Sequence, residues 1–200
     1  MSNILQWNCR GLRSRAENLK VLFRDHNPSV VCLQETKLGD NIYNPGLNYS
    51  IHKSPPPIGD RAKGGTAIIV NKKVQHSLVP IVTTLQAVAV RILLDKYVTV
   101  CSLYLPPDLN FNVNDLQDLI DQLPSPFLLL GDFNAHNPLW GSINLDTKGK
   151  IIEKLIDDNP ISLFNDGSNT YHNIHTNQFS AIDLSICTSS ILLDFAWSVN

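Results

Sequence analysis

Apolar and polar positions follow a clear order along the first forty residues. Ile4–Trp7 is a short apolar run that leads into the polar residue Asn8, and Val30–Leu33 is a second run that leads towards Glu35. Between the two runs, apolar side chains recur at helical spacing over Ala16–His26, which predicts an amphipathic helix. This β-α-β order places polar side chains at the carboxyl ends of two strands, where open α/β sheets bind their ligands.

The rest of the chain mixes the periods of strands and helices. Further strands are predicted at Thr66–Val70, Leu85–Leu94, Val98–Leu105, Phe127–Leu130 and Ala181–Cys187. Helices are predicted at Asn114–Leu123 and Lys148–Asp158, and loops at Ser54–Asp60 and His172–His175. Because β-α-β units are mixed with hairpins, we expect an α/β fold with two packed mixed β-sheets and helices outside, in a single domain over residues 1–200.

The charged residues are distributed unevenly, although the total charge is near neutral. Residues 1–100 hold 13 basic and 6 acidic residues, whereas residues 101–200 hold 3 basic and 12 acidic ones. This division favours a face that attracts polyanions beside an acidic region that holds a divalent cation. The alternative is two unevenly charged surfaces without a ligand.

Cysteine usage and the apolar runs indicate the compartment. The four cysteines lie far apart and form no CxxC pair, so we expect reduced thiols in an intracellular protein. The N-terminus lacks the apolar core of a signal peptide. No apolar run approaches the roughly 20 residues that cross a bilayer, so no membrane association is expected.

Polar side chains that are able to carry chemistry lie at the ends of apolar runs. They are Asn8, Glu35, Tyr104, Asp132 and Asn134, together with Asp183 inside the last predicted strand. A charged group in a strand core is costly without a partner or a metal ion. Carboxylates hold Mg²⁺, while amides and phenols stabilise a phosphate that is under attack. Each position also has a simpler interpretation, such as a surface ion pair of Glu35 with Lys37 or an Asx turn at Asp132.

The polar strand ends belong to short blocks that follow a recognisable order. The blocks are Gln6-Trp7-Asn8-Cys9-Arg10-Gly11-Leu12, Leu33-Gln34-Glu35-Thr36-Lys37, Leu103-Tyr104-Leu105-Pro106-Pro107, Gly131-Asp132-Phe133-Asn134 and Ile182-Asp183. Each block is weak evidence alone, but their ordered combination resembles the endonuclease/exonuclease/phosphatase superfamily over nearly the whole chain. The resemblance implies a DNase I-like, four-layered α/β sandwich with its site at one edge of two packed sheets.

The resemblance also implies a role for each of these residues. Glu35 would be the main ligand of Mg²⁺, for which Mn²⁺ can substitute, and Asn8 would support it. Asp132 would position or deprotonate the attacking water. Asn134 and Tyr104 would hold the phosphate.

One longer block narrows the resemblance. Gly131–Ser142, which reads GDFNAHNPLWGS, looks like the jockey-like non-LTR retrotransposons, and so does Asn169-Thr170-Tyr171. Thr170 is therefore a candidate for an additional phosphate contact. Arg10 and Lys63 are further candidates, because basic side chains position DNA without reading its sequence.

The chain departs from the superfamily pattern at its C-terminal end. The final Ser-Asp-His block, whose histidine Asp183 would orient, is absent. His136, His172 and His175 do not match its position, and the last two lack the partners of a zinc site. We therefore expect a chain that is truncated before its last strand and motif, and that is weakly active or inactive.

The resemblance implies an endonuclease that nicks double-stranded DNA and leaves a 3′-hydroxyl for a reverse transcriptase domain downstream. Its action would be nuclear. One alternative is another phosphoesterase of the superfamily, acting on abasic DNA, nucleotides or phospholipid headgroups. The other is a catalytically dead transposon remnant.

Overall fold

The computed structural model describes residues 2–39, 43–54, 64–173 and 176–199. A four-stranded sheet consists, in spatial order, of β1 (Ile4–Asn8), β2 (Val30–Gln34), β4 (Ala67–Asn71) and β3 (Tyr49–Lys53). A six-stranded sheet consists of β5 (His76–Val79), β6 (Gln86–Leu93), β7 (Tyr97–Tyr104), β8 (Phe127–Asp132), β12 (Asp183–Thr188) and β9 (Ile161–Leu163). Both sheets are mixed, with parallel pairs β1–β2 and β7–β8.

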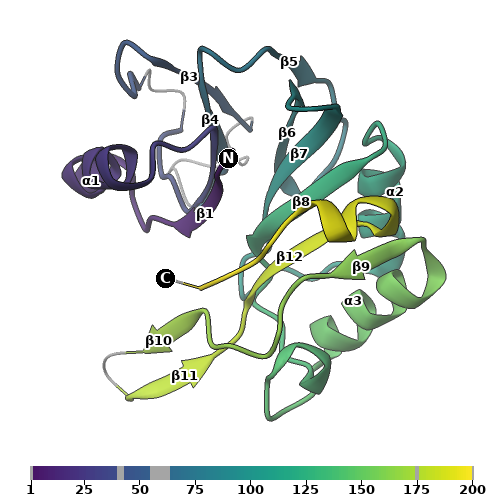
Figure 1. Cartoon of the computed structure of the whole chain (residues 1–200). Helices are drawn as coiled ribbons and strands as arrows, with labels where there is room; N and C mark the ends of the chain where they lie inside the picture. Colours follow the sequence, from purple (N-terminus) through teal and green to yellow (C-terminus); the bar gives the residue numbers. More distant parts are fainter. Residues whose placement is uncertain (1, 40–42, 55–63, 174–175, 200) are drawn as a thin grey trace.

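Helices cover the outer faces of the two packed sheets, which gives the four layers (Figure 1). Helix α1 (Ala16–His26) lies on the four-stranded sheet, and α2 (Val113–Asp121) and α3 (Thr147–Asp158) lie on the six-stranded sheet. Short 3-10 helices η1 (Arg13–Arg15), η2 (Pro138–Trp140) and η3 (Ser189–Asp194) lie in the connections. The predicted fold class is confirmed.

Alternation of side chains along the strands creates three hydrophobic cores. In β2, Val30 and Cys32 face the core between the sheets, whereas Val31 and Leu33 face the core beneath α1. Successive side chains of a strand point to opposite faces, so a strand that is buried on both faces must be apolar throughout. The central strands therefore stand out in the sequence as continuous apolar runs.

The sequence patterns did not predict several of the edge strands. Strands β3, β5 and β9 were not predicted, and the segment expected to be a loop from His172 contains part of a hairpin. Strand β10 (Tyr171–Asn173) pairs there with β11 (Gln178–Ser180), and the hairpin projects from the main body (Figure 1). Such strands bury few side chains, so their hydrophobic period is weak. The loop predicted at Ser54–Asp60 lies, apart from Ser54, outside the described residues.

Two further findings concern the cysteines and the helices. All four cysteines are buried and free, and burial raises the pKa of the Cys9 and Cys187 thiols to about 11. Among the described residues, no helix has both the length and the apolarity to cross a membrane.

Candidate active site

The candidate residues meet where the ends of the two sheets come together. Asn8 is the last residue of β1 and Glu35 directly follows the neighbouring strand β2. In the other sheet, Tyr104 and Asp132 end two parallel strands and are register partners. Asp183 pairs with Asp132 from the antiparallel strand β12. Carboxyl ends of parallel strands lie at the same sheet edge, so the topology gathers these side chains.

Asp183 lies at the start of β12 and not in its interior. The sequence pattern placed this aspartate within a strand beginning at Ala181, but the strand begins at Asp183 itself. The preceding residues form an irregular connection from β11, where the Thr170 hydroxyl accepts hydrogen bonds from the Ile182 and Asp183 amides at 3.2 and 3.0 Å. The prediction of a charge in the strand core was therefore wrong, while its place beside Asp132 follows from the antiparallel register.

Asn8 connects the carboxylates of the two sheets. Its Nδ2 donates to Oε1 of Glu35 at 2.9 Å and to Oδ2 of Asp132 at 2.6 Å. The second oxygen of Glu35 lies 3.8 Å from the ammonium of Lys37, at the outer limit of an ion pair. The surface ion pair between Glu35 and Lys37 is therefore present but long. The shorter contact of Glu35 is the hydrogen bond from Asn8, inside the site.

Burial disfavours the charges at this edge of the sheets. Asp132 is 4% exposed, and burial, followed by the charge of Asp183, raises its pKa to about 7. Burial also raises the pKa of Asp183, against hydrogen bonds from Thr170 and Gln6. The Tyr104 pKa is raised by burial and then by the charges of Glu35 and Asp132, which keeps the phenol protonated.

Strained backbone surrounds the site. Arg10, Glu35, Lys37 and Asn134 have positive φ angles of 48, 50, 51 and 46°. Non-glycine residues rarely adopt this conformation, and such strain concentrates at functional sites. Immediately before Asp132, a Cβ at Gly131 would lie 2.0 Å from the carbonyl oxygen of Leu103. Glycine is therefore required for the close approach of β8 to β7 that sets Asp132 beside Tyr104.

The remaining predicted residues occupy different positions. Asn134 uses its Nδ2 to donate to the carbonyl of Leu105 at 3.1 Å. The Arg10 guanidinium lies 5.0 Å from the ring centroid of Tyr171, so it links the turn after β1 to the hairpin. Lys63 lies outside the described residues. The phosphate contacts proposed for Arg10 and Thr170 stay predictions.

Sequence reasoning missed a buried polar network that supports Asp183. Gln6 donates from Nε2 to Asp183 Oδ1 at 2.8 Å and to Gln34 Oε1 at 3.2 Å. Gln34 donates to the Ser102 hydroxyl at 2.9 Å, and Ser102 donates to the Leu33 carbonyl at 3.2 Å. The signal was available, because Gln34 directly follows the apolar run Val30–Leu33 and Ser102 interrupts the predicted strand Val98–Leu105.

The donors at the site are suited to a hard cation. The carboxylate of Glu35 provides oxygen, and Asn8 supports it through Nδ2 while its own oxygen accepts from the Arg10 amide at 3.2 Å. Mg²⁺ binds through one or two carboxylates while keeping several waters. Within the described part of the chain, no group of three or more His, Cys, Asp or Glu side chains is placed to hold a metal ion. A site based on Glu35 and Asn8 therefore fits a cation that retains water.

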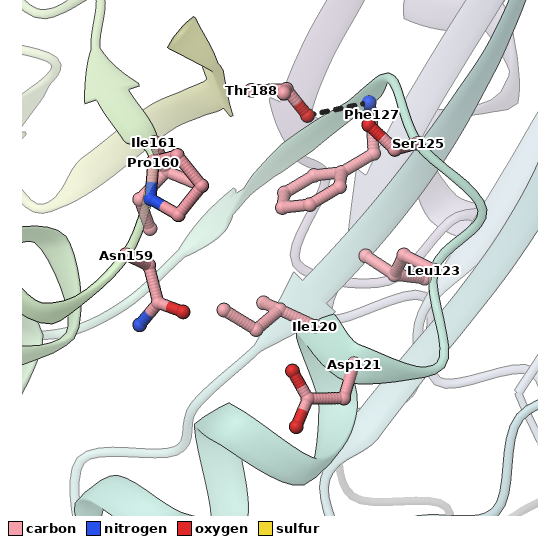
Figure 2. A pocket seen from close by; sticks show the side chains of 9 residues that line it. All are labelled: Ile120, Asp121, Leu123, Ser125, Phe127, Asn159, Pro160, Ile161 and Thr188. Carbon is pink, nitrogen blue, oxygen red and sulfur yellow. Dashed lines mark hydrogen bonds between the residues drawn. The ribbon is translucent and has the colours of Figure 1, made fainter.

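A separate pocket lies at the other end of β8. Its volume is about 240 Å³, and Ile120, Phe127 and Ile161 are among the side chains that line it (Figure 2). Phe127 begins β8 and Asp132 ends it, so the pocket lies about 17 Å along the strand from the candidate site. It holds none of the predicted site residues.

Comparisons with known proteins show a matching family and related sequences. Residues 5–200 match the Endonuclease/Exonuclease/phosphatase family. The chain is 32% identical over 172 residues to the RNA-directed DNA polymerase from mobile element jockey of Drosophila melanogaster, covering 83% of this chain and 18% of that protein. The corresponding Drosophila funebris protein is 27% identical over 171 residues, with the same two shares. The chain thus spans less than a fifth of these relatives.

Solved structures share the fold. The endonuclease domain of TRAS1, a telomere-specific non-LTR retrotransposon, has a TM-score of 0.79 at 20% identity, covering 94% of this chain and 85% of that one. The AP endonuclease LMAP from Leishmania major has a TM-score of 0.72 at 13% identity, covering 94% and 79%. With the family match over nearly the whole length, the chain belongs to the endonuclease/exonuclease/phosphatase family.

Proposed function

We propose that this chain is the endonuclease domain of a non-LTR retrotransposon protein, acting in the nucleus to nick double-stranded DNA. The observation that carries the proposal is the junction of Asn8 with Glu35 and Asp132, which brings the polar ends of both sheets to one place. Similarity to the jockey proteins, whose name describes an RNA-directed DNA polymerase, supports a reverse transcriptase domain as its partner in a longer protein.

The donor set supports a divalent cation, with Mg²⁺ as the natural ion and Mn²⁺ as a substitute. Glu35 and Asn8 would hold it. When bound, the cation stabilises negative charge that develops on the phosphate and the leaving oxygen. The carboxylate of Glu35 is 22% exposed, so it is open to an ion and to its waters.

The other residues act on water and phosphate. Asp132 is buried at the meeting point of the sheets and would orient the attacking water and accept its proton. Tyr104 stays protonated next to Asp132, and its hydroxyl would donate a hydrogen bond to a phosphate oxygen. Attack of water on phosphorus breaks the bond to the 3′-oxygen or the 5′-oxygen. The bond between phosphorus and the 3′-oxygen would break here. This leaves a 5′-phosphate and the 3′-hydroxyl that reverse transcription needs.

The test compares Glu35→Gln with the unchanged chain on supercoiled plasmid in Mg²⁺ and in Mn²⁺. We expect slow nicking to open circles with the unchanged chain, in line with the weak activity expected from the sequence. Nicking with Glu35→Gln is expected to be at least about a hundredfold slower still, because the substitution removes the anionic metal ligand. The matched control is Glu17→Gln, which removes an exposed acid paired with Lys20 and leaves nicking unchanged.

Two additional measurements keep the result decisive if nicking is slow. Mn²⁺ binding, followed by its effect on water proton relaxation, is expected to weaken with Glu35→Gln and not with Glu17→Gln. Abasic duplexes, nucleotides and phospholipid headgroups are assayed in parallel. Faster hydrolysis of one of these substrates, or nicking that is insensitive to Glu35→Gln, would rule out the proposed function.

A further inference from the structure

Lys148 lies on the flank of the candidate site formed by Tyr104 and Asp132. From the first turn of α3, its Nζ donates to the carbonyls of Pro106 at 2.6 Å and Pro107 at 3.0 Å. These two residues belong to the segment that leaves β7 after Tyr104. The amide of Asn134 holds the preceding carbonyl, that of Leu105, in the same segment. The ammonium is therefore fixed beside the site by backbone oxygens.

The environment of Lys148 makes its charge costly. The side chain is half-buried, and burial lowers the pKa of its ammonium, while the charges of Asp146, Asp108 and Asp132 raise it. The first turn of a helix also repels positive charge, because the helix dipole is positive there. An arrangement that costs stability next to a site indicates a functional requirement for the residue concerned. Asp132, the carboxylate at the centre of the site, is among the charges that Lys148 experiences.

Each carboxylate of the site interacts with the charge of a basic side chain. Lys37 lies 3.8 Å from Glu35, and the charge of Arg10 acts on Asp183. Lys148 completes the set on the side of Asp132. DNA phosphates are contacted by cations of this kind, and several contacts along the backbone fix the register of the duplex.

We propose that Lys148 binds a DNA phosphate next to the scissile one, on the Tyr104 side of the site. Two hydrogens of its ammonium are donated to the prolyl carbonyls, and the ammonium also lies 5.8 Å from the ring centroid of Phe111. The third hydrogen would donate to a phosphate oxygen. The inference rests on the proposed function and adds a substrate contact in the half of the chain that is poor in basic residues. The tertiary fold alone brings Lys148 to the loop after β7, because the two lie 41 residues apart in the chain.

The experiment measures binding of a fluorescein-labelled DNA duplex by anisotropy over a series of salt concentrations, with Ca²⁺ in place of Mg²⁺. Lys148→Gln loses the charge and keeps a donor, and Lys148→Arg keeps the charge. Lys150→Gln is the matched control, because Lys150 is exposed on the same helix and its loss changes the net charge equally. Melting temperatures are recorded for all three variants.

We expect Lys148→Gln to weaken binding several-fold and to reduce the slope of log Kd against log salt by about 0.9, the loss of one phosphate contact. Lys148→Arg retains the slope, and Lys150→Gln binds like the unchanged chain. An unchanged slope with a lower melting temperature would show that Lys148 only clamps the loop, and equal losses in both glutamine variants would show a general charge effect. Either result overturns the inference. If the unchanged chain binds no duplex but Mn²⁺ binding still depends on Glu35, the proposed substrate itself is wrong.

Discussion

At the scale of single residues, the site is built from conformations that amino acids other than glycine rarely adopt. Glu35 has a φ of 50°, and Asn134 one of 46°. Asparagine tolerates this region because its short side chain forms local hydrogen bonds, whereas glutamate has no such compensation. The turn after β2 aims the Glu35 carboxylate at Asn8, where the hydrogen bond of 2.9 Å is made. The strain is thus a cost of placing the proposed metal ligand.

This cost can be measured by comparing Glu35→Gly with Glu35→Gln. Both substitutions remove the carboxylate, but only glycine relieves a left-handed backbone. Relief of the strain is partly offset by the conformational entropy that glycine loses on folding. We therefore expect the free energy of unfolding of Glu35→Gly to exceed that of Glu35→Gln by about 0.5–1 kcal/mol in metal-free buffer. Urea unfolding followed by circular dichroism gives the difference. If Glu35→Gln is the more stable variant, the turn holds no strain.

At the scale of elements, the start of α3 is joined to the loop that follows Gly131-Asp132-Phe133-Asn134. Asp146 caps the helix through Oδ1, which accepts from the Gly149 amide at 2.6 Å. Its Oδ2 accepts from the His136 backbone amide at 3.1 Å and contacts Nδ1 of the same residue at 2.9 Å. Trp140 is fully buried and donates to the Ala135 carbonyl at 3.2 Å, so it packs inside this loop. The helix and the loop therefore act as one unit that positions Lys148.

Gly149 shows that packing overrides helix propensity at this junction. In an exposed helix, Gly→Ala stabilises by about 1 kcal/mol. Here a Cβ would lie 2.0 Å from the His136 carbonyl oxygen, so the backbones must separate. We expect Gly149→Ala to lower the free energy of unfolding by about 1–3 kcal/mol, as overpacking does. Chemical denaturation tests this beside Lys150→Ala, an exposed control on the same helix; a stabilised Gly149→Ala variant would contradict the close approach.

At the scale of the whole molecule, the two sheets are joined by more than apolar packing. The hydrogen-bonded chain of Gln6, Gln34 and Ser102 crosses from one sheet to the other and ends on Asp183. Gln34 and Ser102 are fully buried, so each depends on its partner for hydrogen bonds. The network ties the edge that carries Asn8 to the edge that carries Asp132 and Asp183.

A double-mutant cycle tests this connection. We expect Gln34→Met and Ser102→Ala each to destabilise the chain by about 1–3 kcal/mol, because each leaves a buried group without its partner. The double variant is expected to lose less than the sum, with a coupling of about 1 kcal/mol. Urea unfolding supplies the four free energies. Ser77→Ala, at an exposed position of β5, serves as a neutral control, and additive losses would argue against the network.

The sequence by itself determined the central strands, the three α-helices and the identity of the polar residues at the site. Strands such as β2 are buried on both faces and must be apolar throughout, so their pattern survives without the partner sheet. The ordered blocks around Asn8, Glu35 and Asp132 identified the family in the same way, since each block is local in the chain.

Only the tertiary structure decided the edge strands, the start of β12 and the contacts between distant segments. Gln6 meets Asp183 across 177 positions of the chain, and no local pattern records such a pairing. The role inferred for Lys148 likewise depends on a loop far away in sequence. Periodicity reports which face of an element is buried, whereas the partner across that face is fixed by how the sheets pack.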